Sequence, residues 1–272
     1  MTRPPSPRKP RAPRTPPAPL PEPIRYVIMS RARADILPAC SLSLFPDADV
    51  CVDEREADAY RPITRPEKLM LHPPLAGQCA IRNWILDTLK ERIVVILDDD
   101  LEYVVSYVGI RTRRYKEPDD IRQIVENAAT CAEAFRSYLF GFNQTFDPKT
   151  FAPQDPIRLN RWLGTVMGFI GRDTRVRWDD SLKLRGGIEI SLRALLFNLI
   201  IYTDARFRFV STGRFKQRGG ASADRSAERE RQELDALKRR WGKFITFGTR
   251  GGFGAKIIKA KTTVLHVPRR QA

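Results

Sequence analysis

The segment Ile93–Asp100 constrains the fold of this chain more than any other. It begins with Ile-Val-Val-Ile-Leu and ends with three consecutive aspartates. A continuous β-branched and aliphatic run between helical patterns is typical of a central strand with both faces covered. The sequence therefore predicts an α/β fold, a mainly parallel sheet flanked by helices, in which Ile93–Leu97 is an inner strand.

Strand and helix patterns continue on both sides of this run. Before it, we expect strands at 25–30, 48–53 and 69–72, a charged loop at 54–60 and an amphipathic helix at 80–90. We also expect a helix at 36–44, either continuous or interrupted at Pro38. After it, the patterns predict a helix capped by Asp119 or Asp120, strands at 138–142, 166–170 and 207–210, an apolar helix at 188–201, a charged helix at 222–241 and a final strand at 257–267. No repeat or linker divides residues 24–267, which indicates a single domain.

Charge is the second constraint. The formal net charge is +16, with 48 Lys and Arg against 32 Asp and Glu. Such a field attracts polyanions: nucleic acid, an anionic membrane or phosphorylated small molecules. Residues 1–23 are mostly proline and arginine, which predicts a disordered basic arm. This arm either keeps the domain soluble or holds it near a polyanion. Residues 268–272 are expected to be a short tail.

Several classes of protein are disfavoured. No apolar run approaches the ~20 residues that a membrane-spanning helix needs, and the N-terminus has no apolar signal region. The four cysteines are scattered without a CxxC pair, which argues against a zinc site or a disulfide framework. A reducing cytoplasm fits this pattern. With only His72 and His266, chemistry built on several histidines is excluded.

The aspartates at 98–100 carry the chemistry of this segment. Ligands of open parallel sheets bind beyond the carboxyl ends of the strands. Strand alternation predicts that Asp98 and Asp100 point one way and Asp99 the other. Two carboxylates on one side suit a hard cation such as Mg²⁺ or Mn²⁺, which can bridge a diphosphate. The alternative is a solvated acidic turn that caps the next segment.

A family resemblance extends this interpretation. Gly77, the helix start Ala80-Ile81-Arg82-Asn83 and the strand ending in Asp98–Asp100 resemble the nucleotide-binding half of GT-A-fold glycosyltransferases. The later segments Gly219–Arg225 and Arg240-Trp241-Gly242 resemble one branch, the bacteriophage TET-associated glycosyltransferases, thought to decorate hydroxymethylated bases in DNA. The resemblance runs from about residue 24 to 267. It implies a donor-binding half at 24–110 and an acceptor half at 111–267.

The resemblance also implies roles for single residues. Asp98 would contact the sugar or ribose of the donor, Asp99 would lie beside the donor, and Asp100 would ligate the metal together with Asp98. Nucleotide contacts would come from further positions: Ser30 and Arg31 beside the nucleotide, Asp53 and Glu54 near its base or ribose, and Arg82 toward the diphosphate or the aspartates. His266 is a further metal candidate or an ordinary strand histidine. Arg31 and Arg82 are alternatively plain surface charges.

The acceptor side departs from the family pattern. Enzymes of this fold often carry a Glu-Asp pair at the start of a helix here, whereas this chain has Ile188-Glu189. Glu189 would act as general base, or it is a routine partner of the helix dipole. Asp180, with Asp179, is the reserve candidate.

The glycine-rich segment 248–254 is expected to be a mobile loop over the donor, with Arg250 near phosphate. Basic residues beyond position 210 would form a surface for the nucleic-acid backbone: Arg214, Lys216, Arg218, Arg225, Lys256, Lys259 and Lys261.

The resulting hypothesis is a metal-dependent hexosyltransferase. It would move a sugar from a nucleoside-diphosphate sugar such as UDP-glucose, with Mn²⁺ or Mg²⁺, to a hydroxymethylpyrimidine such as hydroxymethylcytosine in phage DNA. If phage-encoded, the chain would act in the host cytoplasm. The alternatives are a GT-A enzyme with a protein, lipid or polysaccharide acceptor, a nucleotidyltransferase, and a non-catalytic DNA-binding protein.

Overall fold

In the computed structural model of the chain, residues 23–108, 111–144, 154–211 and 226–244 are described, together with the short pair 247–248 and 259–260. The predicted arm at 1–22, His266, the segments 219–225 and 249–254, and the remaining basic side chains predicted after position 210 lie outside the described residues. Within the described part, no helix is both long enough and apolar enough to cross a membrane.

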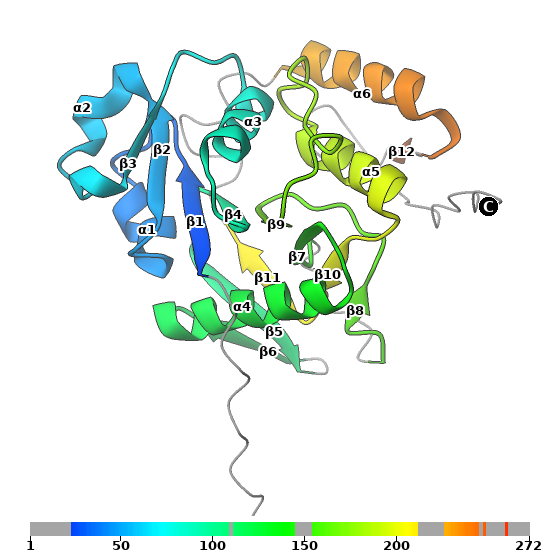
Figure 1. Cartoon of the computed structure of the whole chain (residues 1–272), viewed down its shortest axis with the longest axis horizontal. Helices are drawn as coiled ribbons and strands as arrows, with labels where there is room; N and C mark the ends of the chain where they lie inside the picture. The colour runs from blue at the N-terminus through cyan, green and yellow to red at the C-terminus, as the bar shows by residue number, and fades with distance from the viewer. Residues whose placement is uncertain are drawn as a thin grey trace, which may run out of the picture.

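The first four strands build a parallel sheet. They lie in the order β3-β2-β1-β4 (Figure 1), with bounds β1 (Ile24–Met29), β2 (Asp49–Asp53), β3 (Leu69–His72) and β4 (Ile93–Asp98). The register aligns the ends of β1 and β4, since Met29 pairs with Asp98. It also aligns Asp53 with His72 at the ends of β2 and β3. The chain therefore brings its strand-end polar residues to one edge, and the predicted α/β class is confirmed.

The sheet continues beyond β4 with strands of both directions. β9 (Val166–Ile170) is antiparallel to β4, and the order proceeds through β7 (Leu139–Phe142), β10 (Tyr202–Asp204) and β8 (Ile157–Arg158). Gly168 makes the contact between β9 and β7 possible. A Cβ there would lie 2.1 Å from the ring of Phe140, so the ring fills the place of a side chain.

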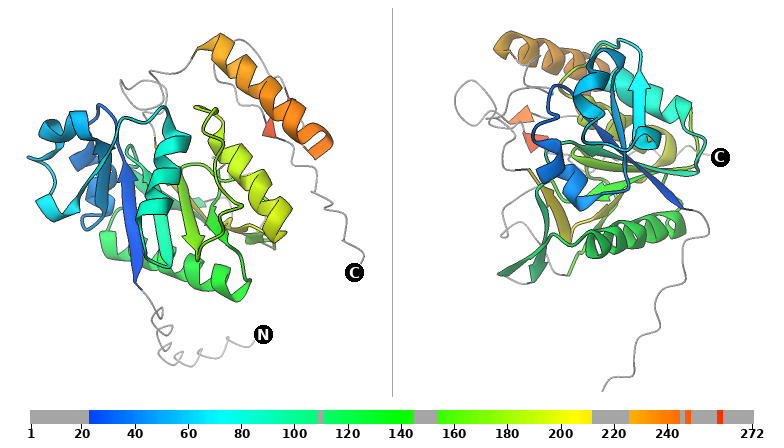
Figure 2. Two further views of the ribbon diagram at one scale, coloured as in Figure 1. Left: turned by 45° about the horizontal axis from the view of Figure 1, so that its top comes forward. Right: turned by 90° about the vertical axis from the view of Figure 1, so that its left-hand side faces the viewer.

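Both faces of the sheet are covered, as the apolar run predicts. Ile93, Val95 and Leu97 pack into one hydrophobic cluster, and Val94 and Ile96 into another. The Val94 cluster contains residues of α3 (Gln78–Thr88), α5 (Gly186–Asn198) and α6 (Ala227–Trp241), and the Ile93 cluster those of α1 (Ser41–Leu44), α2 (Ala57–Tyr60) and α4 (Pro118–Ala134). Figures 1 and 2 show α6 and α4 on opposite sides of the molecule.

A second, smaller sheet follows the aspartates and was not expected. It consists of β11 (Phe207–Val210), β5 (Tyr103–Val108) and β6 (Arg111–Tyr115), all antiparallel, with β6 at its edge. Only β11 was among the predicted strands, although β5 is also apolar and reads Tyr-Val-Val-Ser-Tyr-Val. The short remaining elements are η1 (Leu37–Ala39), η2 (Glu54–Glu56), η3 (Pro66–Lys68), η6 (Gly242–Phe244), β12 (Phe247–Gly248) and β13 (Lys259–Ala260).

One open local point is resolved by the structure, and two local predictions differ from it. Pro38 does interrupt the predicted helix, which splits into η1 and α1. The segment predicted as a charged loop at 54–60 is helical, because the Asp53 side chain caps η2 by accepting from Arg55 N at 2.9 Å. The helix expected to be capped by Asp119 or Asp120 starts earlier, with Glu117 at the N-cap and Pro118 in its first turn.

Candidate functional site

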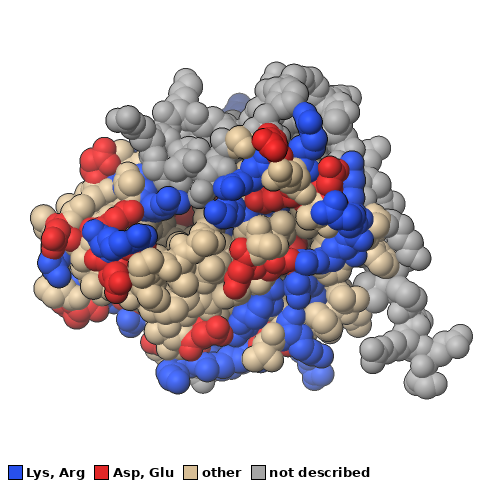
Figure 3. All heavy atoms as spheres, turned by 90° about the horizontal axis from the view of Figure 1, so that it is seen from above, with Lys and Arg blue, Asp and Glu red and all other residues tan. Residues whose placement is uncertain are grey.

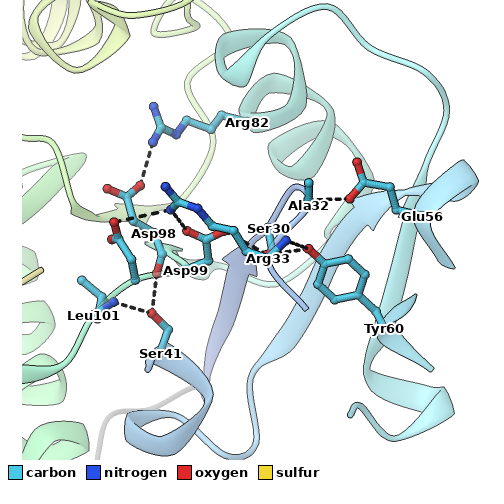
Figure 4. A network of polar contacts seen from close by, with 11 residues as sticks. Ser30, Ala32, Arg33, Ser41, Glu56, Tyr60, Arg82, Asp98, Asp99 and Leu101 are labelled. Atoms are coloured by element: carbon cyan, nitrogen blue, oxygen red, sulfur yellow. Dashed lines mark hydrogen bonds and ion pairs between the residues drawn. The ribbon is translucent and has the colours of Figure 1, made fainter. Parts of the chain in front are cut away.

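The three aspartates lie where β4 ends, beside the end of β1 (Figure 4). Asp98 is the last residue of β4, and Asp99 and Asp100 form a turn. Ser41 fixes this turn from α1, because its hydroxyl donates to the Asp98 carbonyl at 2.6 Å and accepts from Leu101 N at 2.9 Å. The turn is therefore tied to the β1–β2 connection, which is distant in sequence.

Asp98 is held by an arginine from α3. Arg82 Nη2 donates to Asp98 Oδ1 at 3.1 Å, and the Arg82 guanidinium lies over the Trp178 ring at 5.7 Å from its centroid. Arg82 is buried, whereas the Asp98 side chain is 26% exposed. Arg82 thus contacts the Asp cluster, one of its two expected positions, and Asp98 is the most accessible of the three carboxylates.

Asp99 and Asp100 share a different arginine. Arg33 Nη1 lies 2.6 Å from Asp99 Oδ1 and 3.4 Å from Asp100 Oδ2, and all three side chains are buried. Strand alternation predicts that Asp99 and Asp100 point in opposite directions, whereas both contact Arg33. The strand ends at Asp98, so strand geometry does not apply to the two residues in the turn.

The loop after β1 completes a buried hydrogen-bond network. Ser30 Oγ donates to Asp99 Oδ2 at 2.9 Å and lies 2.8 Å from Tyr60 Oη, which also accepts from Arg33 N at 3.1 Å. Burial raises the pKa of Asp99, and the neighbouring Arg33 opposes this rise. Burial likewise raises the pKa of Tyr60. Figure 4 shows these side chains converging from α2, the β1 loop and the end of β4.

The other predicted nucleotide contacts lie outside this network. Asp53 is occupied by Arg55, whose Nε and Nη2 lie 2.8 Å and 2.7 Å from its carboxylate oxygens. These hydrogen bonds lower the pKa of Asp53 to about 2. Glu54 and Arg31 are exposed. In the loop after β1, the buried arginine against the aspartates is Arg33, which the sequence reasoning passed over.

The segment after Val176 is held against α3 by Asn83. The Asn83 amide donates to Trp178 O at 3.0 Å and to Asp180 Oδ1 at 2.7 Å, and its oxygen accepts from Trp178 N at 3.0 Å. Asn83 follows Arg82, so neighbouring residues of α3 contact Asp98 and Asp180. The Asp180 side chain is exposed, and Asn83 ties this reserve candidate to the helix that carries Arg82.

Glu189 has a different environment. It is fully buried near the start of α5, where Arg193 and Arg240 contact Oε1 and Asp179 N donates to Oε2 at 3.3 Å. Burial raises its pKa, and Arg193 opposes the rise. Glu189 therefore links α5, α6 and the segment that carries Asp180.

Helix α6 is anchored at the start of α5 by a second buried carboxylate. Glu233 accepts from three successive backbone N–H groups, those of Lys183, Leu184 and Arg185, at 2.8 to 3.0 Å. Successive N–H groups of this kind form a concavity that favours an anion. Leu237 and Trp241 of α6 are buried in the core, so α6 is part of the acceptor-side structure. On the face above these elements (Figure 3), Lys and Arg lie among Asp and Glu.

The carboxylates suit a divalent cation in part. In the described part of the chain, no group of three or more His, Cys, Asp and Glu residues is arranged to hold a metal ion. Mg²⁺ is commonly held by one or two carboxylates together with substrate phosphates. A cation at Asp98 and Asp100 would therefore need a bound diphosphate to supply its other ligands.

The chain resembles solved structures of S. aureus TarS. It aligns with TarS 1-349 in complex with UDP-GlcNAc at 13% identity and a TM-score of 0.46, over 79% of this chain and 66% of that one. For another TarS 1-349 structure the values are 13% and 0.42, over 68% and 59%, and for TarS itself 12% and 0.43, over 81% and 44%. This chain thus spans less than two thirds of the TarS structures. With TM-scores below 0.5, the likeness assigns no activity to it, and the α/β class rests on its own strand order.

No protein-family model matches the chain, and no curated protein matches it in sequence.

Proposed function

We propose that this chain is a GT-A-type glycosyltransferase that uses a nucleoside-diphosphate sugar. One observation carries the proposal: three adjacent carboxylates at the end of a central parallel strand are held by two buried arginines, Arg33 and Arg82. Carboxylates can accept from the hydroxyls of a sugar or ribose, and guanidinium groups match a diphosphate. Both kinds of group therefore meet at one strand end, where ligands of α/β sheets bind.

In this proposal the donor contacts the most accessible carboxylate. Asp98 accepts from a sugar or ribose hydroxyl, and Arg82 donates toward the diphosphate. Ser30 and Asp99 fix the orientation of Arg33, so that the site is preorganised before the donor arrives. Arg31, Asp53 and Glu54 stay candidates for nucleotide contacts, since they follow the neighbouring strands.

We further propose that Asp98 and Asp100 hold Mn²⁺ or Mg²⁺ when the donor is bound, with His266 an additional candidate. A bound cation would neutralise the charge that develops on the nucleoside-diphosphate leaving group. Arg33 supplies positive charge beside Asp100, and Arg82 does so beside Asp98.

Asp180 is our candidate for the acceptor base, ahead of Glu189. It is exposed, and its carboxylate is held by Asn83, the neighbour of Arg82 in α3. Glu189 is enclosed by two arginines and a backbone N–H, which suits a positioning role. A base is required if the reaction inverts configuration, and Asp180 would then take the proton of the acceptor hydroxyl.

The proposed acceptor is a hydroxymethylpyrimidine in DNA. The net charge of +16 and the resemblance of the later segments to phage enzymes support this choice. A base within duplex DNA must leave the stack before its hydroxyl can reach a catalytic site. A single-stranded acceptor should therefore react faster than the same sequence in a duplex.

Mass spectrometry of nucleosides tests the proposal. DNA that contains hydroxymethylcytosine or hydroxymethyluracil is incubated with the protein, Mn²⁺ and a panel of nucleoside-diphosphate sugars, and we expect a product heavier by one hexose. Asp100→Ala should abolish transfer, whereas the control Asp58→Ala, at an exposed helix position, should not. Full activity of Asp100→Ala would refute the metal assignment. No transfer, together with no change in melting temperature with any donor, would refute the enzymatic function.

A pair of variants tests the base. Asp180→Asn should lower kcat by about 10²- to 10⁴-fold, the usual contribution of a general base, at an unchanged melting temperature. Glu189→Gln should lower the melting temperature, because it weakens a buried contact to two arginines. If Asp180→Asn keeps full kcat, Asp180 is not the base.

A further inference from the structure

Strand β6 presents an unusual concentration of positive charge. It reads Arg111-Thr-Arg-Arg-Tyr115, is the edge strand of the small sheet, and exposes its first four residues. Lys116 follows and is also exposed. A sheet edge that carries charged side chains resists pairing with another strand, so this edge is built to stay open.

The arginines of β6 differ from nearby arginines in their ion pairing. Arg122 of α4 lies 3.7 Å from Asp47, and Arg206, just before β11, lies 2.7 Å from Asp204. Within the part of the chain that the structure describes, Arg111, Arg113 and Arg114 have no carboxylate at ion-pair distance. Among the described residues, no carboxylate therefore neutralises their charges.

Aromatic rings orient two of these arginines. The Arg113 guanidinium lies 4.9 Å from the centroid of the Tyr115 ring, and that of Arg114 lies 4.7 Å from the Tyr103 ring. Stacking of this kind restricts a long side chain and leaves its N–H donors directed outward. Ordering these side chains on a ligand therefore costs less entropy than ordering free ones.

The edge is continuous with the candidate site. Tyr103, on which Arg114 stacks, begins β5 and follows Asp100 by three residues, a span of at most ~11 Å of extended chain. The C-terminal end of β11 also reaches this point, because Glu102 N donates to Val210 O at 2.8 Å. A polymer bound along β6 would thus lead toward the aspartates.

We propose that the arginine edge, Arg111, Arg113 and Arg114, binds the phosphodiester backbone of the acceptor DNA strand. This inference rests on the proposed function, because it assigns a surface to the acceptor of that site. Alternate residues of a strand lie on the same face, ~6.8 Å apart. Arg111 and Arg113 therefore present two guanidinium groups along one face of the strand, and Arg114 projects from the other face.

Fluorescence anisotropy with a labelled 20-nucleotide single-stranded DNA tests this surface. The variant is Arg111→Gln/Arg113→Gln/Arg114→Gln, and the matched control is Arg61→Gln/Arg65→Gln/Arg175→Gln, which removes equal charge from exposed arginines elsewhere. Neutralising three phosphate contacts should reduce the slope of log K against log salt by about 2, at ~0.7 per contact on a single strand. The control should change the slope by less than half as much.

Three results would overturn the inference. One is an unchanged slope in the β6 variant, and another is an equal change in the control, which would indicate net charge alone. The third is a β6 variant that no longer binds phosphatidylglycerol vesicles but still binds DNA, which would indicate that the surface binds membranes. The donor-induced melting shift should be the same in the β6 variant as in the wild type. Failure of this surface is thereby separated from failure of the proposed function, in which no donor shift occurs at all.

Discussion

Replacing Arg33 by methionine tests the central claim about the Asp cluster. Arg33 contacts Asp99 and Asp100, and the exposed fractions of the three side chains are 8%, 7% and 8%. Methionine keeps most of the volume and removes the charge. Two carboxylates would then be left close together in a buried site, where each raises the cost of ionising the other.

The size of the effect follows from this burial. Removing one partner of a buried ion pair costs about 3–5 kcal/mol, and in a chain of this size 1 kcal/mol corresponds to about 2–4 °C in melting temperature. Arg33→Met should therefore melt about 6–20 °C below the wild type at pH 7. The control Arg61→Met breaks an exposed pair with Asp58 and should melt within about 2 °C of the wild type.

The pH dependence of the same variant checks the cause. Burial already raises the pKa of Asp99, and a carboxyl with a raised pKa in the folded state stabilises at low pH and loses that contribution as pH rises through the raised value. Losing Arg33 raises this pKa further. The deficit of Arg33→Met should therefore shrink as pH is lowered from 7 toward 5. A variant that melts like the wild type at pH 7, or a deficit constant with pH, would contradict the network described here.

Two further predictions concern other parts of the fold. Arg55 lowers the pKa of Asp53 to about 2 from its ordinary 3.8, so Asp53 stabilises the fold above pH 3.8 and loses this contribution as pH falls through about 2. Asp53→Asn should flatten acid unfolding between these values, as followed by circular dichroism. Gly168→Ala places a Cβ 2.1 Å from the Phe140 ring and should destabilise by about 1–3 kcal/mol or more. Phe140→Leu in the same chain should recover part of this loss in a urea titration.

The parallel half of the sheet was predictable because its strands have clear apolar patterns in the sequence. Every residue of Ile93–Leu97 is apolar, and each lies on one of the two covered faces of the sheet. The apolar run in the sequence therefore indicates a strand that is covered on both faces. β6 has no such pattern. Four of its residues are exposed, and it is a strand because β5 pairs with it. A sequence pattern based on burial does not detect a strand that buries almost nothing.

The location of the candidate site could be predicted from the sequence, but the hydrogen bonds and ion pairs between its residues could not. The end of β4 follows from the apolar run, and Arg82 follows from its place at a helix start. Arg33 contacts Asp99 across a separation of 66 residues, and Tyr60 contacts Ser30 across 30 residues. No local pattern distinguishes Arg33 from Arg31. The choice between them depends on Tyr60 Oη, which accepts from Arg33 N and orders the loop.

Glu189 illustrates a related limit on the acceptor side. At sequence level a carboxylate at a helix start is a general base or a dipole partner, and both roles require only its position. The structure adds contacts from Arg193, one turn later, and from Arg240 of α6. Their charges offset part of the cost of burying the carboxylate, and Glu189 thereby links the two helices. Because Glu189 also accepts from Asp179 N, its loss would displace Asp180. Reduced activity in a Glu189 variant therefore does not identify the base, and the melting temperatures of the two variants must be compared.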